Sequence, residues 1–434
     1  MDIAVSRLHT RILAIGGMLL SLALPSSSSM ATSATQANAS SAQPPSHDLF
    51  RELQPLKNDL QRYRYLSDAL PRLPLEERIA LQQLLAAVED ELGLYDEAVR
   101  DFPFDNRIQF NAELPQPAEW QASDAVEVIT KLAADRRIVM VNEAHHDAHT
   151  RALTLALLPR LRAEGFTHFA AEALNDHDGT LMQRGYPVAD SGSEYLHEPL
   201  YGEIVRQAIQ LGFIVVPYES EAGDLAEREA GQARQLYRKV FQAEPNARLF
   251  VHAGYAHIDK APGNLGGTIP PMAMLLKRLS GFDPLTIDQT RWRDIGSSAG
   301  NDSYRQLLTL YQPQGPVVLT RRADGTAWSS DPTRHDVDVL LPPTGHQRRP
   351  HWLSLDGRRK SHLITTELCN SHLPCVIEAR YAHESSDAIP ADRYGFLDGE
   401  SMNSLYLYPG SYRLRAWDVD GRTLTQRNID VPRP

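Results

Sequence analysis

The sequence predicts an α/β protein with a mainly parallel sheet flanked by helices, preceded by a helical hairpin and followed by a small all-β, sandwich-like domain. In the middle of the chain, short apolar runs alternate with amphipathic stretches, which is typical of βαβ units around a buried parallel sheet. Before this region apolar residues recur at helical spacing, and after it apolar and polar residues alternate as in strands. A chain of 434 residues is also too long for one ordinary core.

Residues 1–39 have the composition of a signal peptide. Arg7 and Arg11 precede an apolar run from Ile12 to Leu24, and a Ser/Ala-rich stretch ends in Ala37-Asn38-Ala39, which suits cleavage after a small residue. The apolar run is short for a permanent membrane span, and an uncleaved anchor is the less favoured alternative. We therefore expect a periplasmic or secreted protein with no membrane span after cleavage.

Residues 40–117 are expected to form a flexible lead-in, a helical hairpin and a linker. Residues 40–48 are polar and rich in Pro and Ser. From Leu49 to about Val99, leucines recur at three- and four-residue steps, and Pro71 and Pro74 divide this pattern into two helical parts. The stretch from Phe102 to Pro117 has the composition of a linker.

Residues 118–325 are expected to form the α/β domain. Helical stretches are predicted near 148–164, 198–211, 224–243 and 270–280. The predicted strands between and beside them are Ile138–Val141, His168–Glu172, Phe213–Tyr218, Leu249–His252, Leu285–Ile287 and Val317–Leu319.

Residues 332–434 are expected to form the sandwich-like β domain. Its predicted strands are Asp336–Leu341, His362–Thr366, Val376–Tyr381, Ser404–Tyr408, Tyr412–Asp418 and Thr423–Val431. Tyr406, Tyr408, Tyr412 and Trp417 could form a sugar-binding face, but ordinary packing at the edge of the sandwich is the favoured interpretation. Cys369 and Cys375 are the chain's two cysteines, and in an oxidising compartment they are expected to form a disulfide rather than half of a zinc site.

The charge balance limits the classes of partner. The formal net charge is −11, and no cluster of Lys and Arg large enough for a nucleic-acid surface is present. We therefore expect a small-molecule or peptide substrate and no nucleic acid. A cell-envelope partner bound through the C-terminal β domain is a further hypothesis.

Acidic and histidine side chains follow four of the predicted parallel strands. In chain order these are Glu143, His145 and His146, then Glu172, then Glu219, and finally Tyr255 and His257. Ligands in open α/β sheets bind beyond the carboxyl ends of the strands, so we expect these side chains to share a cleft. Eight of the sixteen histidines fall between His145 and His257.

Glutamate and histidine together can support three kinds of chemistry. A neutral imidazole accepts a proton near pH 7 while a carboxylate orients it or a water molecule. The same side chains can ligate a divalent metal, and an imidazole or a tyrosine can ligate haem iron. Taken singly, His149, His168, His177 and His197 are interpreted as ordinary loop residues. The loop from Glu143 to His146 and His257 form the predicted site, because two separate strand ends supply matching chemistry.

Other enzyme signatures are not favoured. The sequence has no H-E-x-x-H, no P-loop and no G-x-G-x-x-G after a strand. The one G-x-S-x-G, Gly296 to Gly300, follows a polar stretch rather than an apolar strand, which argues against a serine nucleophile.

The predicted site resembles that of a superfamily that includes ChaN-like haem-binding proteins, TraB/Tiki proteins and erythromycin-esterase-like hydrolases. Asn142-Glu143-Ala144-His145-His146 is similar to the Gly-Glu-x-His and Gly-Glu-x-x-His loop of these families, and Gly254-Tyr255-Ala256-His257 to their second histidine loop. The run from Arg228 to Gln235 and Pro271-Met272 match further motifs. The resemblance covers roughly Asp124 to Thr290. Asn142, Glu229, Gln232 and Gln235 depart from the family pattern.

The resemblance implies an exported hydrolase acting on an ester or amide. His145 or His146 would be the general base, with Glu143 orienting it, His257 would assist the leaving group, and Glu172, Arg228, Glu219 and Tyr255 would bind substrate. A metal-assisted variant would use His145, His257 and Glu143 as ligands of a divalent metal. A ChaN-like protein that binds haem or metal without turnover is the alternative. A third hypothesis is an inactive scaffold whose β domain binds envelope partners.

Overall fold

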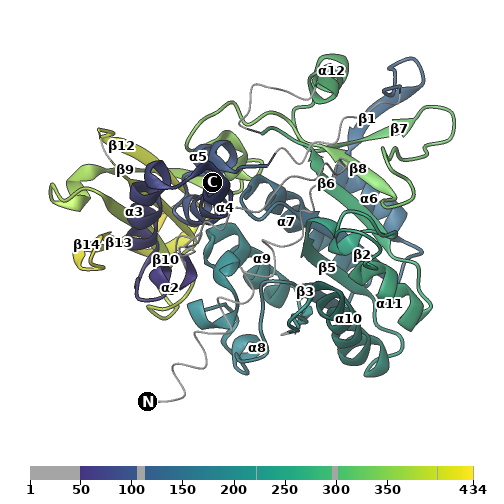
Figure 1. Cartoon of the computed structure of the whole chain (residues 1–434), viewed down its shortest axis with the longest axis horizontal. Coiled ribbons are helices and arrows are strands. Elements are labelled where there is room, and N and C mark those ends of the chain that lie inside the picture. The colour runs from purple at the N-terminus through teal and green to yellow at the C-terminus, as the bar shows by residue number, and fades with distance from the viewer. Residues whose placement is uncertain (1–48, 105–112, 221, 296–301, 398, 434) are drawn as a thin grey trace, which may run out of the picture.

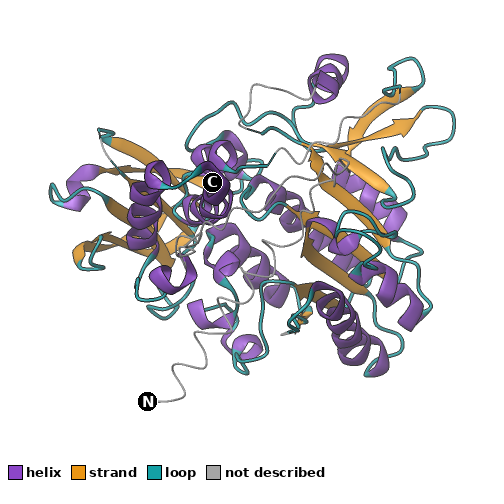
Figure 2. Ribbon diagram, viewed as in Figure 1, coloured by secondary structure: helices purple, strands orange, loops and turns teal. Residues whose placement is uncertain are grey.

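The computed structural model describes residues 49–104, 113–220, 222–295, 302–397 and 399–433. The predicted signal peptide and the segment Gly296 to Gly300 lie outside these residues. The predicted fold class is confirmed: a mainly parallel eight-stranded sheet is flanked by helices, and separate antiparallel sheets follow near the C-terminus (Figure 2).

The large sheet has the strand order β1-β7-β8-β6-β2-β5-β3-β4. Strand β7 is antiparallel to both of its neighbours, and every other pair is parallel. The strands are β1 Trp120–Asp124, β2 Ile138–Glu143, β3 His168–Ala171, β4 Ile214–Pro217, β5 Leu249–Gly254, β6 Leu285–Trp292, β7 Val317–Arg321 and β8 Val337–Leu340. Strands β5 and β6 pair with β2 on its two sides, so the loop after β2 lies at the centre of the carboxyl edge.

Both faces of the sheet are covered by helices, which explains why the central strands β2, β3 and β5 are buried along their whole length. Alternate residues of β2 point to opposite faces: Val139 and Val141 pack with one helix set, and Ile138 and Met140 with the other. The first set is α6 Ala125–Ala133, α7 His149–Ala163 and α9 Pro199–Gln210. The second is α10 Leu225–Leu236 and α11 Met272–Ser280. The remaining helices of this domain are α8 Leu181–Arg184 and α12 Asp302–Tyr311.

The helices that begin at Leu49 and the strands from Lys360 onward fold together into one unit, which we call the terminal unit (Figure 1, purple and yellow). Its helices are α2 Leu49–Leu53, α3 Asp59–Ala69, α4 Leu75–Glu91 and α5 Tyr95–Asp101. Its strands are β9 Lys360–Thr365, β10 Cys375–Tyr381, β11 Asp392–Phe396, β12 Met402–Leu407, β13 Gly410–Asp418 and β14 Thr423–Val431. They form sheets of order β11-β10-β13-β14 and β12-β9. A single core contains Leu60 and Leu85 of the helices together with Ile377 and Leu414 of the strands.

Several elements differ from the sequence-based expectation. Strand β8, predicted as the start of the C-terminal β domain, pairs with β6 and β7 in the large sheet. Its short apolar pattern is compatible with a strand of the large sheet or of the C-terminal sheets. Only its hydrogen-bonded pairing with β6 and β7 shows that it belongs to the large sheet. Strand β1 and helices α6 and α12 were not predicted. The runs that carry β1 and α6 are short, and β1 lies at the sheet edge, where the apolar signal is weak.

The structure also bears on the cysteine pair, on the aromatic residues of the C-terminal strands and on membrane-spanning helices. Cys369 and Cys375 form the predicted disulfide. Tyr412 and Trp417 are buried rather than displayed on a sugar-binding face, so the packing interpretation holds for them. No helix in the described ranges is long and apolar enough to cross a membrane.

The shared core of the terminal unit predicts that its two halves unfold together. Leu60 of α3 is fully buried in that core, and we expect Leu60→Ala to lower the free energy of unfolding by about 2–5 kcal/mol. Limited proteolysis should then cleave α2–α5 and β9–β14 at the same rate. Leu75→Ala is the matched control, because Leu75 is 75% exposed and its loss should cost less than about 0.5 kcal/mol. Cleavage of the helices while the strands stay protected would contradict the common core.

Candidate active site

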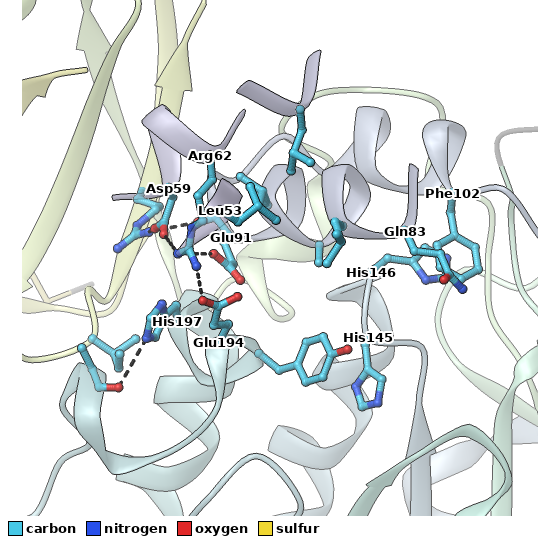
Figure 3. Close-up of a pocket in the computed structure, with 18 of the residues that line it drawn as sticks. Leu53, Asp59, Arg62, Gln83, Glu91, Phe102, His145, His146, Glu194 and His197 are labelled. Atoms are coloured by element: carbon cyan, nitrogen blue, oxygen red, sulfur yellow. Dashed lines mark hydrogen bonds and ion pairs between the residues drawn. The ribbon is translucent and has the colours of Figure 1, made fainter. Parts of the chain in front are cut away.

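A cavity of about 760 Å³ lies between the carboxyl edge of the large sheet and the terminal unit. The α/β domain lines it with five of the predicted site residues: His145, His146, Arg228, Tyr255 and His257. Side chains of α3 and α4 line the other side (Figure 3). Glu143, Glu172 and Glu219 lie behind this lining and contact it through hydrogen bonds. The structure therefore brings the predicted loops to one cavity.

Glu143 ends β2 and holds the ring of His145. Its Oε1 lies 2.7 Å from His145 Nδ1, and its Oε2 accepts a hydrogen bond from Arg151 Nε at 2.6 Å. His252 Nε2 lies 3.2 Å from the same Oε2. Burial alone would raise the pKa of Glu143, but the charge of Arg151 holds that pKa well below its ordinary value. Glu143 is thus an ionised carboxylate that holds Nδ1 of His145.

The other nitrogen of His145, Nε2, is buried and has no hydrogen-bond partner among the described residues. The ring stacks on Tyr195, with ring centroids 4.1 Å apart, and meets Tyr255 edge-on at 5.5 Å. It also packs on Gly254 at the end of β5. A Cβ added to Gly254 would come within 2.6 Å of His145 Cε1, closer still to Nε2, and within 3.2 Å of Glu172 Oε2. Glycine at this position is what allows the ring to lie there.

Arg151 is the buried cation beneath the site. Besides Glu143, its guanidinium donates to Asp90 Oδ2 at 2.7 Å and to Glu198 Oε2 at 3.0 Å. It also donates to the carbonyl of His145 at 3.0 Å. All three carboxylates are almost fully buried, and burial raises the pKa of Asp90 well above its ordinary value, against the opposing charge of Arg151. These contacts connect α4, β2, α7 and the start of α9.

Glu172, Arg228 and Glu219 form a second ionic network. Arg228 of α10 donates to Glu172 Oε1 at 2.7 Å and to Glu219 through Nε at 2.9 Å. The backbone N–H of Gly254 donates to Glu172 Oε2 at 2.5 Å. Burial favours the neutral acid, but His257 and Arg228 lower the pKa of Glu172 to about 2. Three of the four predicted substrate-binding residues are therefore paired with one another, and of these three Arg228 lines the cavity.

His257 lies in η5, Tyr255–Ile258, between two carboxylates. Its Nδ1 is 2.5 Å from Glu229 Oε1, and its Nε2 is 3.4 Å from Glu172 Oε1. Glu229 is itself fixed, since its Oε2 accepts the N–H of Met272 at 2.6 Å. Burial and Arg228 oppose a positive ring, but the carboxylates raise the pKa of His257 to about 9. His257 is accordingly an imidazolium at neutral pH.

His146 has a different environment from His145. Its ring stacks on Phe102 with centroids 3.5 Å apart, its Nδ1 is 2.9 Å from the Tyr255 hydroxyl, and Arg293 Nη2 donates to its Nε2 at 3.2 Å. Burial and the charge of Arg293 hold the pKa of His146 well below its ordinary value. Both ring nitrogens are engaged, so His146 fixes Tyr255 and has no nitrogen left to accept a proton from water.

The predicted metal ligands are not arranged as one set. Both oxygens of Glu143 are bound by Arg151 and His145, and both nitrogens of His257 face carboxylates. Within the described ranges, three ligand atoms come within 4.8 Å of one another in two other groups, Asp59–Glu91–His197 and Asp288–His335–Asp338. In the first group, arginine side chains already pair with the acids. Arg62 pairs with Asp59 and with the neighbouring Glu194 (Figure 3), and Arg393 also pairs with Asp59.

Several site residues were missed from the sequence, among them Asp90, Arg151, Glu198, His252 and Arg293. Two features of the sequence indicate buried charges with distant partners. Glu89-Asp90-Glu91 places three acids at the C-terminal end of a helix, where the helix dipole disfavours them. Arg151 lies in the first turn of α7, where the dipole disfavours a cation. A charge in such a position indicates a tertiary partner.

Comparison with known proteins identifies no family. No family model and no curated protein match the chain. Two solved structures are similar in part. The type III effector HopBA1 is 16% identical, with 41% of this chain and 86% of that chain covered and a TM-score of 0.29. A structure described as "Bacterial protein toxins" is 13% identical, with 56% and 47% covered and a TM-score of 0.29. Scores this low say nothing about function.

The contact between Gly254 and His145 predicts an effect of adding one methyl group. Gly254 has φ −77° and ψ 142°, which any residue can adopt, so Gly254→Ala acts through the clash with His145 and not through the backbone. We expect it to lower the free energy of unfolding by about 1–3 kcal/mol, measured by denaturant unfolding. Gly179→Ala is the control, since a Cβ there meets nothing within 4 Å. Equal stability of the two variants would contradict the close packing at Gly254.

The protonated state of His257 predicts a loss of stability at alkaline pH. A group whose pKa is raised on folding stabilises the protein fully below its unfolded pKa near 6.5, and this contribution disappears as pH rises through about 9. We expect a decline on the order of 3 kcal/mol between pH 6 and pH 10, measured by denaturant unfolding. His257→Gln should remove this part of the decline, and the slope that persists reports the other titrating groups. An unchanged slope in that variant would contradict the assignment.

Proposed function

We propose that this protein is a hydrolase in which His145 is the general base. The observation that supports this most directly is the Glu143–His145 pair: an ionised, buried carboxylate binds Nδ1 at 2.7 Å, and Nε2 has no partner among the described residues while its ring lines the cavity. Such a pair holds the imidazole in one tautomer and stabilises the imidazolium that forms on proton transfer.

The proposed reaction is attack of water on an ester or amide carbonyl. His145 Nε2 takes a proton from the water, and the oxygen bonds to the carbonyl carbon. The bond to the leaving group then breaks, and the leaving group takes a proton from the imidazolium of His257. His257 suits this role because the carboxylates of Glu229 and Glu172 keep it protonated near neutral pH.

Two further groups can stabilise negative charge on the carbonyl oxygen. Arg228 lines the cavity beside His257, with Nη1 3.4 Å from His257 Nε2. Tyr255 is held by His146, and burial raises the pKa of its phenol well above the ordinary value, so it stays a neutral donor. Since Arg293 donates to His146 Nε2, we infer that His146 Nδ1 carries the proton and donates to the Tyr255 oxygen. The Tyr255 hydroxyl proton is then free for the substrate.

The proposal agrees with the resemblance of the Glu143–His146 loop to the erythromycin-esterase-like branch of the superfamily. The cavity volume of about 760 Å³ suits a small-molecule or short peptide substrate. A periplasmic or secreted location, as expected from residues 1–39, fits the disulfide between Cys369 and Cys375. An envelope partner of the C-terminal strands stays a prediction.

The proposed general base predicts a large loss of activity in one variant. We expect His145→Asn to lower kcat/KM for carboxylic esters by about 10²–10⁴-fold, because the asparagine cannot accept a proton at the position of Nε2. Hydrolysis of a panel of p-nitrophenyl esters and lactones measures this. His372→Ala is the control, since His372 is exposed and hydrogen-bonds locally to the Asn370 carbonyl.

Two results would overturn the proposal. The first is an active wild type whose His145→Asn variant is equally active and equally stable. The second is a wild type without turnover on the panel that gains a Soret band on adding haem, with the band lost in His145→Asn or Tyr255→Phe. That second result would favour the ChaN-like binding function.

A further inference from the structure

A second polar cluster lies on the cavity wall, on the other side of β2 from His257. It is formed by Asp288 in β6, Asp338 in β8 and His335 in the turn before β8. Asp288 and His335 line the same cavity as His145. Neither the Glu143–His145 pair nor the Arg228 network uses these residues.

The two aspartates are register partners on neighbouring parallel strands, so their side chains point to the same face of the sheet. Both are nearly fully buried, at 2% and 1% exposure. Two carboxylates side by side away from water repel each other unless a cation lies between them. The arrangement therefore calls for positive charge at this position.

Each carboxylate has one oxygen fixed and the other available. Asp288 Oδ1 accepts from Asn142 Nδ2 at 2.6 Å and from the Thr290 N–H at 3.1 Å. Asp338 Oδ2 accepts from Trp292 Nε1 at 2.8 Å and from the Ser330 N–H at 2.9 Å. The contacts of Asp288 Oδ2 and Asp338 Oδ1 are longer: Arg291 Nε at 3.8 Å and Ser329 Oγ at 3.4 Å, respectively. Outer hydrogen bonds that orient a carboxylate and leave one oxygen available are typical of metal ligands.

His335 supplies the second, independent observation. It is 2% exposed, and its Nε2 lies 2.7 Å from Asp259 Oδ1. Its Nδ1 is buried and has no hydrogen-bond partner in the described part of the chain. One of its ring nitrogens lies within 4.8 Å of carboxylate oxygens of both Asp288 and Asp338. A histidine that donates one N–H to a carboxylate and keeps the other nitrogen unpaired has the arrangement of a metal-bound imidazole.

We propose that Asp288, His335 and Asp338 bind a divalent first-row transition metal ion, with Asp259 as the carboxylate that orients His335. Two carboxylates and one imidazole suit Zn²⁺ or Mn²⁺ better than Ca²⁺, which takes oxygen ligands. Because the cluster faces the cavity, the remaining coordination positions are open to water or to a ligand.

The group Asp59–Glu91–His197 differs from this cluster in the source of its positive charge. It has the same ligand types, but Arg62 and Arg393 supply its positive charge. Arginines of the chain pair directly with the first group. At the second group Arg291 approaches Asp288 only at 3.8 Å, so the positive charge between the two aspartates must come from His335 or from a bound ion.

The test is calorimetric titration of ZnCl₂ into the chelator-treated full chain, with Mn²⁺ and Ca²⁺ titrated separately. We expect one Zn²⁺ per chain with a micromolar or tighter Kd, weaker Mn²⁺ binding and the weakest Ca²⁺ binding. His335→Gln and Asp338→Asn should each weaken Zn²⁺ binding by more than about 100-fold, and Asp259→Asn by about 10–100-fold. His257→Gln and Glu91→Gln are matched controls that should leave the Kd unchanged, since each alters a buried acid or histidine outside the cluster.

Three results would overturn the proposal: no Zn²⁺ or Mn²⁺ bound by the wild type, an unchanged Kd in the folded cluster variants, or loss of binding in a control instead. If the cluster variants do not fold, anomalous diffraction from Zn²⁺-soaked wild-type crystals decides, because a peak between Asp288, His335 and Asp338 supports the site and a peak elsewhere refutes it. Binding is measured without substrate, so failure of the proposed hydrolysis leaves this result unaffected.

Discussion

The buried guanidinium of Arg151 is the constraint on which the rest of the site depends. It binds the carboxyl groups of Glu143, Asp90 and Glu198, which come from three elements far apart in the sequence. Removing one partner of a buried ion pair costs about 3–5 kcal/mol, because the remaining charge has no water to solvate it. The end of β2, the C-terminal end of α4 and the start of α9 are therefore fixed to one another through a single side chain. The position of His145 follows from this, since Glu143 and Arg151 hold its ring and its carbonyl.

The surrounding charges give two neighbouring histidines of the cavity different protonation states. Carboxylates on both sides keep His257 positive, while burial and Arg293 keep His146 neutral. His145 contacts the carboxylate of Glu143, which Arg151 also binds, and its second nitrogen has no partner among the residues that the structure describes. His257 and His146 therefore differ in charge although they line one cavity. The difference between them arises from their partners and not from the residue type.

Asn142 connects this site to the cluster at Asp288. Its Nδ2 donates to Asp288 Oδ1 and to the Tyr255 carbonyl, and its Oδ1 accepts the N–H of Gln289. A residue without this side chain would leave Asp288 without the donor, so the end of β2 and the cluster at Asp288 are two parts of one local arrangement. Anything bound at Asp288 would share the cavity with a substrate at His145.

The sequence by itself determined the fold class, the strands β2 to β5, the disulfide and the two loops that carry Glu143, His145 and His257. These follow from local patterns: apolar runs of strand length, helical spacing, and polar residues directly after a strand. The tertiary structure alone decided that His145 and His335 each keep a ring nitrogen without a partner among the described residues. It also decided that β8 joins the large sheet, that α2–α5 share a core with β9–β14, and that Asp90 and Arg151 meet. Those features depend on pairing between residues far apart in the chain, and the energy of such pairs comes from burial, which local patterns do not record.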